Sequence, residues 1–138
     1  MTGAMGRNKQ LALLYVEDEP EIREMMEKVL SWQYPDLSLY VASDGAKGLG
    51  LFLEHRQELV LTDFNMPVMT GIQMAQQIMA IDSETVIIAV TAYNSDSFIS
   101  TAMENGFSSY ISKPINFGDL CRAIDEGISR ISEKMDAG

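Results

Sequence analysis

The chain has 138 residues, with 20 acidic and 10 basic side chains and a net charge of -10. This length suits one domain, and 46% hydrophobic residues suffice for a packed core, which argues against a disordered chain. No apolar run approaches the ~20 residues that cross a bilayer, so no membrane span is expected. The acidic balance argues against direct nucleic-acid binding, because neutralising phosphates needs a basic patch. The single cysteine, Cys121, permits no internal disulfide, which favours a cytoplasmic location.

Short apolar runs rich in β-branched residues recur at intervals of about two dozen residues and predict strands. They span residues 11–16, 37–42, 58–62, 85–90 and 108–112. Near-continuous hydrophobicity, clearest in LALLYV and TVIIAV, is typical of strands covered by helices on both faces. The more mixed runs, LSLYVA and SSYIS, are expected at the edges of the sheet.

The segments between these strands show the spacing of amphipathic helices. The inward stripes are expected to comprise Ile22, Met25, Met26, Val29 and Leu30, then Ala46, Leu49, Phe52 and Leu53, then Ile72, Ala75, Ile78 and Met79, then Ile99, Ala102 and Met103, and finally Leu120, Ile124, Ile128, Ile131 and Met135. Alternation of strand and helix predicts an α/β fold, with a parallel sheet and helices on both faces. The folded domain is expected over residues 9–131. Residues 1–8 are interpreted as a leader or expression scar, and residues 132–138 as a C-terminal tail or linker.

Polar side chains follow four of the five predicted strands. Glu17 and Asp18 follow the first, Asp63 closes the third, Thr91 follows the fourth and Lys113 follows the fifth. Because ligands bind at the carboxyl ends of parallel strands, we expect these side chains to converge at one edge of the sheet. Singly, each residue could be a strand-end cap or a turn former. Their placement together at one edge of the sheet favours a functional site over five separate caps or turns.

The residue types at this predicted site indicate its chemistry. Crowded carboxylates repel one another and call for a cation, and oxygen ligands without histidine or cysteine favour Mg2+. An aspartate, a hard divalent ion, a lysine and a hydroxyl together suit phosphoryl transfer. The carboxylate attacks phosphorus while the cations neutralise the phosphoryl oxygens.

The segments LLYVEDEP, LTDFNMPVMTG, IIAVTAY and SSYISKPI resemble, in this order, the four signature blocks of CheY-like receiver domains of response regulators. The resemblance covers residues 9–131, nearly the whole chain. It implies a flavodoxin-like (βα)5 three-layer sandwich with a parallel sheet of order 2-1-3-4-5. It also implies a two-component phosphorelay, in which Asp63 accepts a phosphoryl group from a phosphohistidine of a sensor histidine kinase or phosphotransfer protein.

The resemblance also implies the ligands of a Mg2+ ion. Asp18 and Asp63 would bind the metal directly, the backbone carbonyl of Asn65 would be a third ligand, and Glu17 would reach it through water. Many members of the family have Asp at the position of Glu17. The extra methylene group should be tolerable for a water-mediated ligand.

Further positions match the phosphoryl contacts and the switch of the family. Thr91 and Lys113 would each contact a phosphoryl oxygen, and Pro114 would follow a cis peptide bond. Tyr110 matches the switch aromatic, which turns inward as Thr91 moves toward the phosphate. The signal would leave through the surface formed by the fourth helix, the last strand and the last helix, where an output domain or effector could bind.

Three alternatives remain open, of which a flavodoxin is the weakest because no Ser/Thr-rich phosphate loop follows the first strand. A phosphatase of the haloacid dehalogenase type also combines Asp, Thr, Lys and Mg2+, but it needs a second aspartate where Asn65 stands, and it needs room for a cap domain. A degenerate receiver that acts as a scaffold would not be expected to retain all four of Asp18, Asp63, Thr91 and Lys113. We therefore expect a signalling domain that assists its own phosphorylation and dephosphorylation, rather than an enzyme. The sequence leaves open the cognate kinase, the output pathway, the oligomeric state, the phosphorylated lifetime, and whether the chain acts alone or within a longer protein.

Overall fold

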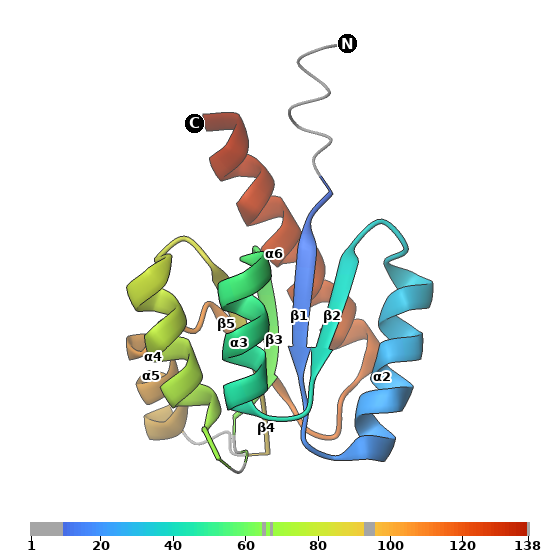
Figure 1. Cartoon of the computed structure of the whole chain (residues 1–138), viewed down its shortest axis with the longest axis vertical. Coiled ribbons are helices and arrows are strands. Elements are labelled where there is room, and N and C mark those ends of the chain that lie inside the picture. Colours follow the sequence, from blue (N-terminus) through green and yellow to red (C-terminus); the bar gives the residue numbers. More distant parts are fainter. Residues whose placement is uncertain (1–9, 65, 67, 93–95, 138) are drawn as a thin grey trace.

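The computed structural model describes residues 10–64, 66, 68–92 and 96–137. Within them the strands form one parallel sheet in the order β2-β1-β3-β4-β5 (Figure 1). The strands are β1 (Ala12–Val16), β2 (Ser38–Ala42), β3 (Leu59–Asp63), β4 (Val86–Thr91) and β5 (Ser109–Ser112). Each lies within one residue of its predicted bounds, and the two mixed runs are the edge strands. The predicted flavodoxin-like order is therefore confirmed.

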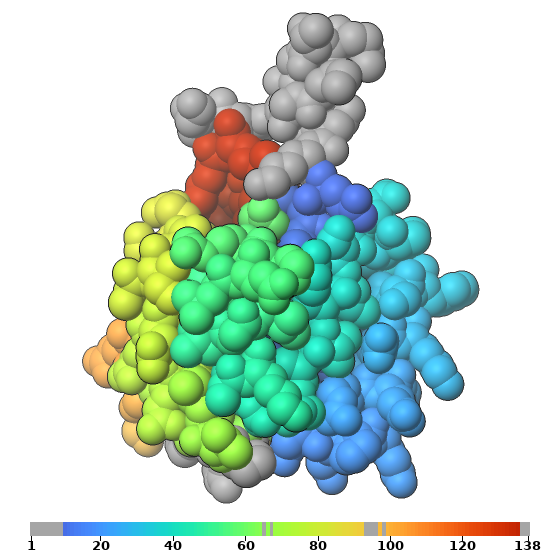
Figure 2. All heavy atoms as spheres, viewed as in Figure 1, coloured from blue at the N-terminus to red at the C-terminus, as the bar shows by residue number. Residues whose placement is uncertain are grey.

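Helices cover both faces of the sheet. They are α2 (Pro20–Gln33), α3 (Gly45–His55), α4 (Gly71–Ile81), α5 (Asp96–Glu104) and α6 (Phe117–Ala137). Buried side chains of α2 and α6 pack on one face, around Tyr15 and Leu61. Those of α3, α4 and α5 pack on the other face, around Val16 and Ile87. Side chains of α3 and α4 form the near surface in Figure 2.

The first turns of α3 and α4 explain where these helices begin. The Asp44 side chain accepts the Lys47 N–H at 2.8 Å, as expected of an N-cap. Thr70 and Gln73 form a reciprocal capping box at the start of α4. Gly71 packs so close to β3 that a Cβ atom there would lie 2.6 Å from the Asp63 carbonyl oxygen. This close approach requires glycine and fixes α4 against the end of β3.

The last helix, α6, extends beyond residue 131 to residue 137, so most of the segment 132–138 is helical. The domain boundaries after residues 8 and 131 stay predictions. The carboxyl ends of the strands lie at the end opposite that from which α6 projects (Figure 1). Among the described helices, none has the length and apolar character that a bilayer span needs.

Candidate functional site

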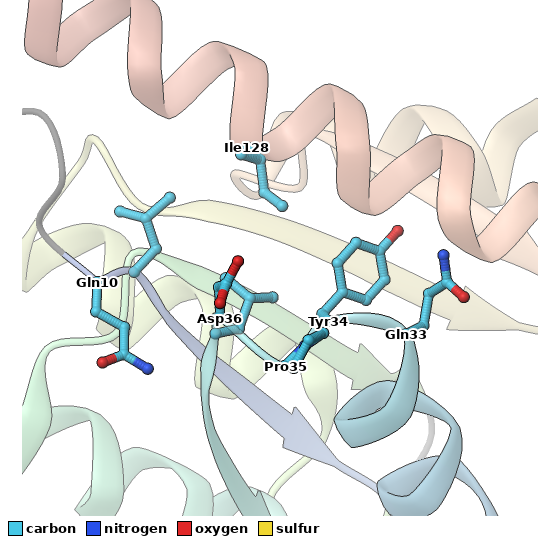
Figure 3. Close-up of a pocket in the computed structure, with 8 residues that line it drawn as sticks. Gln10, Gln33, Tyr34, Pro35, Asp36 and Ile128 are labelled. Atoms are coloured by element: carbon cyan, nitrogen blue, oxygen red, sulfur yellow. The ribbon is translucent and has the colours of Figure 1, made fainter.

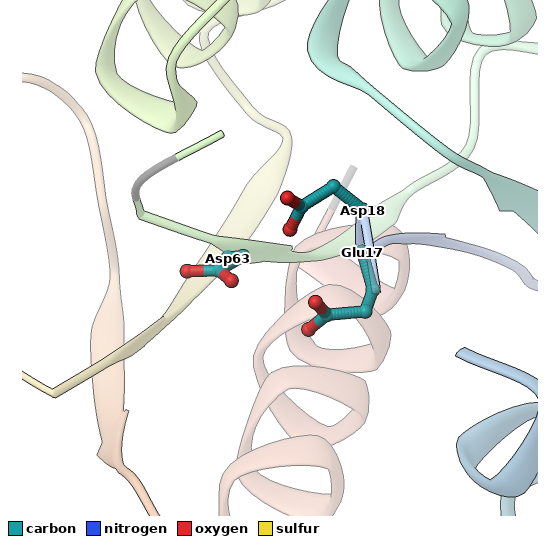
Figure 4. A group of neighbouring side chains, drawn as sticks. All are labelled: Glu17, Asp18 and Asp63. Atoms are coloured by element: carbon teal, nitrogen blue, oxygen red, sulfur yellow. The ribbon is translucent and has the colours of Figure 1, made fainter. Parts of the chain in front are cut away.

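Three carboxylates meet at the carboxyl ends of β1 and β3. Val16 pairs with Thr62 across the two strands, so the next residues, Glu17 and Asp63, end side by side. One carboxylate oxygen each of Glu17, Asp18 and Asp63 lies within 4.8 Å of those of the other two. Figure 4 shows the three side chains projecting from adjacent strand ends. The predicted convergence of the acidic residues is therefore observed.

Burial makes this cluster electrostatically unfavourable without a cation. Glu17 is 1% exposed and Asp63 is 6% exposed. Burial raises the pKa of Glu17 above its ordinary value, and the charges of Asp63 and Asp18 act in the same direction. The Glu19 N–H, which donates to Glu17 Oε2 at 3.1 Å, opposes this shift. A bound cation would relieve the repulsion.

Lys113 supplies a positive charge at the same place. Its Nζ donates to Asp63 Oδ2 at 2.7 Å. Burial alone would lower the pKa of Lys113, but the hydrogen bond to Asp63 and the negative charges of Asp63, Glu17 and Asp18 together outweigh burial. The pKa of Lys113 is therefore raised above its ordinary value. The Lys113 N–H donates to the Thr91 carbonyl at 2.9 Å, which ties the residue to the end of β4. The Lys113–Pro114 peptide bond is cis, as the resemblance implies.

Thr91 and Tyr110 lie on neighbouring strands. Thr91 ends β4 and is 5% exposed. Tyr110 in β5 pairs with Ala89 in β4, and Ala89 lies two residues before Thr91. The side chains of Tyr110 and Thr91 therefore belong to the same face of the sheet. Tyr110 is 40% exposed. The remaining predicted ligand, the carbonyl of Asn65, lies outside the described residues.

The donor set fits a hard divalent cation. The three candidate ligands in the described part of the site offer carboxylate oxygens, with neither histidine nor cysteine among them. Mg2+ prefers such ligands and commonly retains several waters, whereas Zn2+ sites usually include nitrogen or sulfur. Glu17, Asp18 and Asp63 are thus chemically suited to hold Mg2+.

A separate pocket lies at the opposite end of the sheet. It has a volume of about 630 Å3 and is lined by Gln10, Leu11, Gln33, Tyr34, Pro35, Asp36, Leu37 and Ile128 (Figure 3). The Tyr34 hydroxyl donates to Asp125 Oδ1 at 2.9 Å and so links the end of α2 to α6. No candidate site residue lines this pocket. The convergent charged groups, rather than the pocket, define the candidate functional site.

Two neighbours of the site, Arg23 and Tyr15, could not be recognised from the sequence alone. Arg23 Nη1 donates to the carbonyl oxygens of Glu17 and Asp18 at 2.9 and 3.3 Å. Tyr15 is 1% exposed, and its hydroxyl has no hydrogen-bond partner among the described residues. Burial raises the pKa of Tyr15, and the Glu17 and Asp63 charges add to this effect. The sequence offered only weak signals for them: Arg23 is a basic residue within an acidic segment, and Tyr15 is a tyrosine within an apolar strand.

The chain matches known proteins over most of its length. A family model described as the response regulator receiver domain matches residues 13–125. An uncharacterized response regulatory protein of Staphylococcus epidermidis is 28% identical over 123 residues, which are 88% of this chain and 48% of that protein. The chain spans about half the length of the curated relatives it matches.

Solved structures show the same architecture. A CheY-like receiver domain protein of Methanospirillum hungatei is 25% identical with a TM-score of 0.82, over 91% of this chain and 98% of that one. The receiver domain of the Saccharomyces cerevisiae response regulator Ssk1, solved with the phosphotransfer protein Ypd1, has a TM-score of 0.80 at 24% identity, over 89% and 92% of the two chains. These matches give no support to the phosphatase alternative. From the family model, the sheet order and the relatives together, the chain belongs to the response regulator receiver domains, the signalling domains of two-component systems.

Proposed function

We propose that Asp63 is the phosphoacceptor of this receiver domain. The environment of the Asp63 carboxylate supports this assignment. The carboxylate lies 2.7 Å from Lys113 Nζ and beside the carboxylates of Glu17 and Asp18. A buried carboxylate among groups that hold or supply positive charge is suited to attack phosphorus.

The proposed transfer balances in atoms and charge. A carboxylate oxygen of Asp63 bonds to phosphorus as the bond from phosphorus to the donor imidazole nitrogen breaks. The electron pair returns to the imidazole, which takes up a proton. Lys113 keeps its ammonium group against the new phosphoryl oxygens, and the Thr91 hydroxyl donates to another of them. The domain thereby assists its own phosphorylation. Water attack on the same phosphorus would break its bond to the Asp63 oxygen, which restores the carboxylate and releases inorganic phosphate.

A Mg2+ ion is part of the proposal. Asp18 and Asp63 would hold it directly and Glu17 through water. When bound, Mg2+ supplies positive charge against the phosphoryl oxygens. A ligand specific to the folded state adds about 1.4 kcal/mol to the free energy of unfolding at ten times its Kd. We expect Asp18→Asn to reduce this Mg2+ effect. An unchanged melting temperature of the wild type in millimolar Mg2+ would contradict the metal site.

The phosphoacceptor assignment has a direct test. Incubation with acetyl phosphate and Mg2+ should add one phosphoryl group that is stable in acid and labile in alkali, measured by intact-protein mass spectrometry. Asp63→Asn should abolish the label. Asp82→Asn, at an exposed aspartate that follows α4 at the other end of the sheet, is the matched control and should be labelled normally. An unlabelled wild type would support the scaffold alternative, and turnover of phosphate monoesters would support the phosphatase.

The proposed phosphodonor is a sensor histidine kinase or a phosphotransfer protein. A structural neighbour supports this partner class, because the Ssk1 receiver domain was solved with the phosphotransfer protein Ypd1. A cytoplasmic location, where a single cysteine stays reduced, belongs to the same proposal.

The proposed output surface comprises α5, β5 and α6, with Tyr110 within it. An effector or an output domain would bind there when Thr91 moves toward the phosphoryl group. The greater length of the relatives supports an output domain elsewhere in such proteins. With a net charge of -10, the chain itself is not proposed to bind nucleic acid.

A further inference from the structure

The Arg23 side chain, on α2, is hydrogen-bonded to the backbone carbonyls of Glu17 and Asp18, the two acidic residues that follow β1. One nitrogen, Nη1, donates to the carbonyl of Glu17 at 2.9 Å and to that of Asp18 at 3.3 Å. We infer that Arg23 is a positioning residue of the Mg2+ site, which sets the turn from which the Glu17 and Asp18 carboxylates project. The inference rests on the metal site proposed above.

The rest of this turn is held by β2, by a hydrogen bond within the turn and by the backbone of α2. The Glu17 N–H donates to the carbonyl of Ala42 at the end of β2, at 3.1 Å. The Glu19 N–H donates to the Glu17 carboxylate at 3.1 Å, and the Arg23 N–H donates to the Glu19 carbonyl at 2.9 Å. Arg23 is therefore bonded to three consecutive carbonyls, two through its side chain and one through its backbone. The guanidinium joins the body of α2 to the two acidic residues.

Two effects of Arg23 on Mg2+ binding oppose each other. Its positive charge close to the site repels a cation, so charge alone predicts tighter Mg2+ binding when the residue is neutralised. Its hydrogen bonds hold the ligand turn in one conformation, so their loss predicts weaker binding. Neighbours that orient metal ligands typically change metal affinity by about 10- to 100-fold. Arg23 is only half-buried, where solvent screens its charge, so the positioning effect should dominate.

The experiment is a calorimetric titration of MgCl2 into the full chain. Arg23→Gln should weaken Mg2+ binding about tenfold. Arg23→Lys keeps the charge and part of the hydrogen bonding, and its Kd should fall between those of wild type and Arg23→Gln. Arg130→Gln removes the same charge from an exposed position on α6 and should leave the Kd unchanged. Urea unfolding without Mg2+ verifies that each variant is folded, because a merely structural role would lower stability without changing the Kd of the folded protein.

The outcomes separate this inference from the proposed function. A wild type that binds no Mg2+ would refute the metal site itself. A wild type that binds Mg2+ while folded Arg23→Gln binds it equally well or more tightly would overturn the role of Arg23. If Arg23→Gln does not fold, Arg23→Lys decides, and a Kd equal to that of the wild type would overturn the inference.

Discussion

The ammonium of Lys113 lies 2.7 Å from Asp63 Oδ2, and this pair joins the end of β5 to the end of β3 across β4. The Asp63 side chain is 7% exposed and that of Lys113 is 29% exposed, so the contact is screened only in part. Lys113 thereby places a positive charge beside the cluster of Glu17, Asp18 and Asp63.

Replacing Lys113 should therefore destabilise the metal-free fold. Lys113→Met leaves three carboxylates close together, and breaking a partly buried pair should cost about 1–2 kcal/mol. Urea unfolding in EDTA measures this loss. Lys134→Met breaks the more exposed pair with Glu84 at 2.9 Å and should cost less, about 0–1 kcal/mol. Equal losses in the two variants would contradict the expected role of Lys113.

Glu17 should make stability depend on pH in the metal-free protein. Its folded pKa is raised above the unfolded value, so the native state retains a proton that the unfolded state has lost. Stability contributed by this group is present below the unfolded pKa and is lost as pH rises through the folded pKa. Glu17→Gln should thus be more stable than wild type near neutral pH in EDTA, with the difference shrinking in acid. A difference that grows toward low pH would show the opposite linkage.

Thr91 should be needed for switching more than for phosphorylation. A ligand shifts an equilibrium only through its differential affinity for two states, and the Thr91 hydroxyl is the group that the phosphoryl oxygens would engage differently. Thr91→Ala should still be labelled by acetyl phosphate, but beryllofluoride should cause smaller amide shifts in β5 and α6.

Thr85 provides the matched control for Thr91, because the two threonines lie at the two ends of the same strand. Thr85 directly precedes β4 at the opposite end of the sheet, and its buried hydroxyl has no hydrogen-bond partner among the described residues. Thr85→Ala should leave the beryllofluoride response intact. Wild-type shifts confined to the neighbours of Asp63, with Tyr110 unaffected, would refute the switch while leaving the phosphoacceptor proposal standing.

Val68, five residues after the proposed phosphoacceptor Asp63, occupies a strained backbone conformation. Its φ is 70°, in the left-handed region that a β-branched residue rarely adopts, and the residue is 81% exposed. Val68→Gly should raise the free energy of unfolding by about 0.5–1 kcal/mol, because relief of strain exceeds the entropy cost of glycine and little burial is lost. Val68→Ala retains a Cβ atom and should gain less. Urea unfolding of the two variants distinguishes strain from side-chain exposure.

The strands and the acidic cluster could be predicted from the sequence because their signals are local. A strand that helices cover on both faces is apolar from end to end, so its own residues mark where it begins and ends. The bounds of all five strands were predicted to within one residue. Once five such strands are parallel, the residues after each must meet at one edge, so Glu17, Asp18, Asp63 and Lys113 needed no contact information to be placed together.

Only the tertiary structure decided which side chains of each helix are buried and which groups hold the site. Met25 and Leu53 belong to the predicted inward stripes, yet they are 56% and 51% exposed, because the sheet covers a narrower strip of each helix than the apolar residues occupy. The bond from Arg23 to the carbonyl of Glu17 depends on how α2 returns past the end of β1. The positive φ of Val68 likewise runs against the local preference of a β-branched residue, so the sequence around it did not predict this conformation.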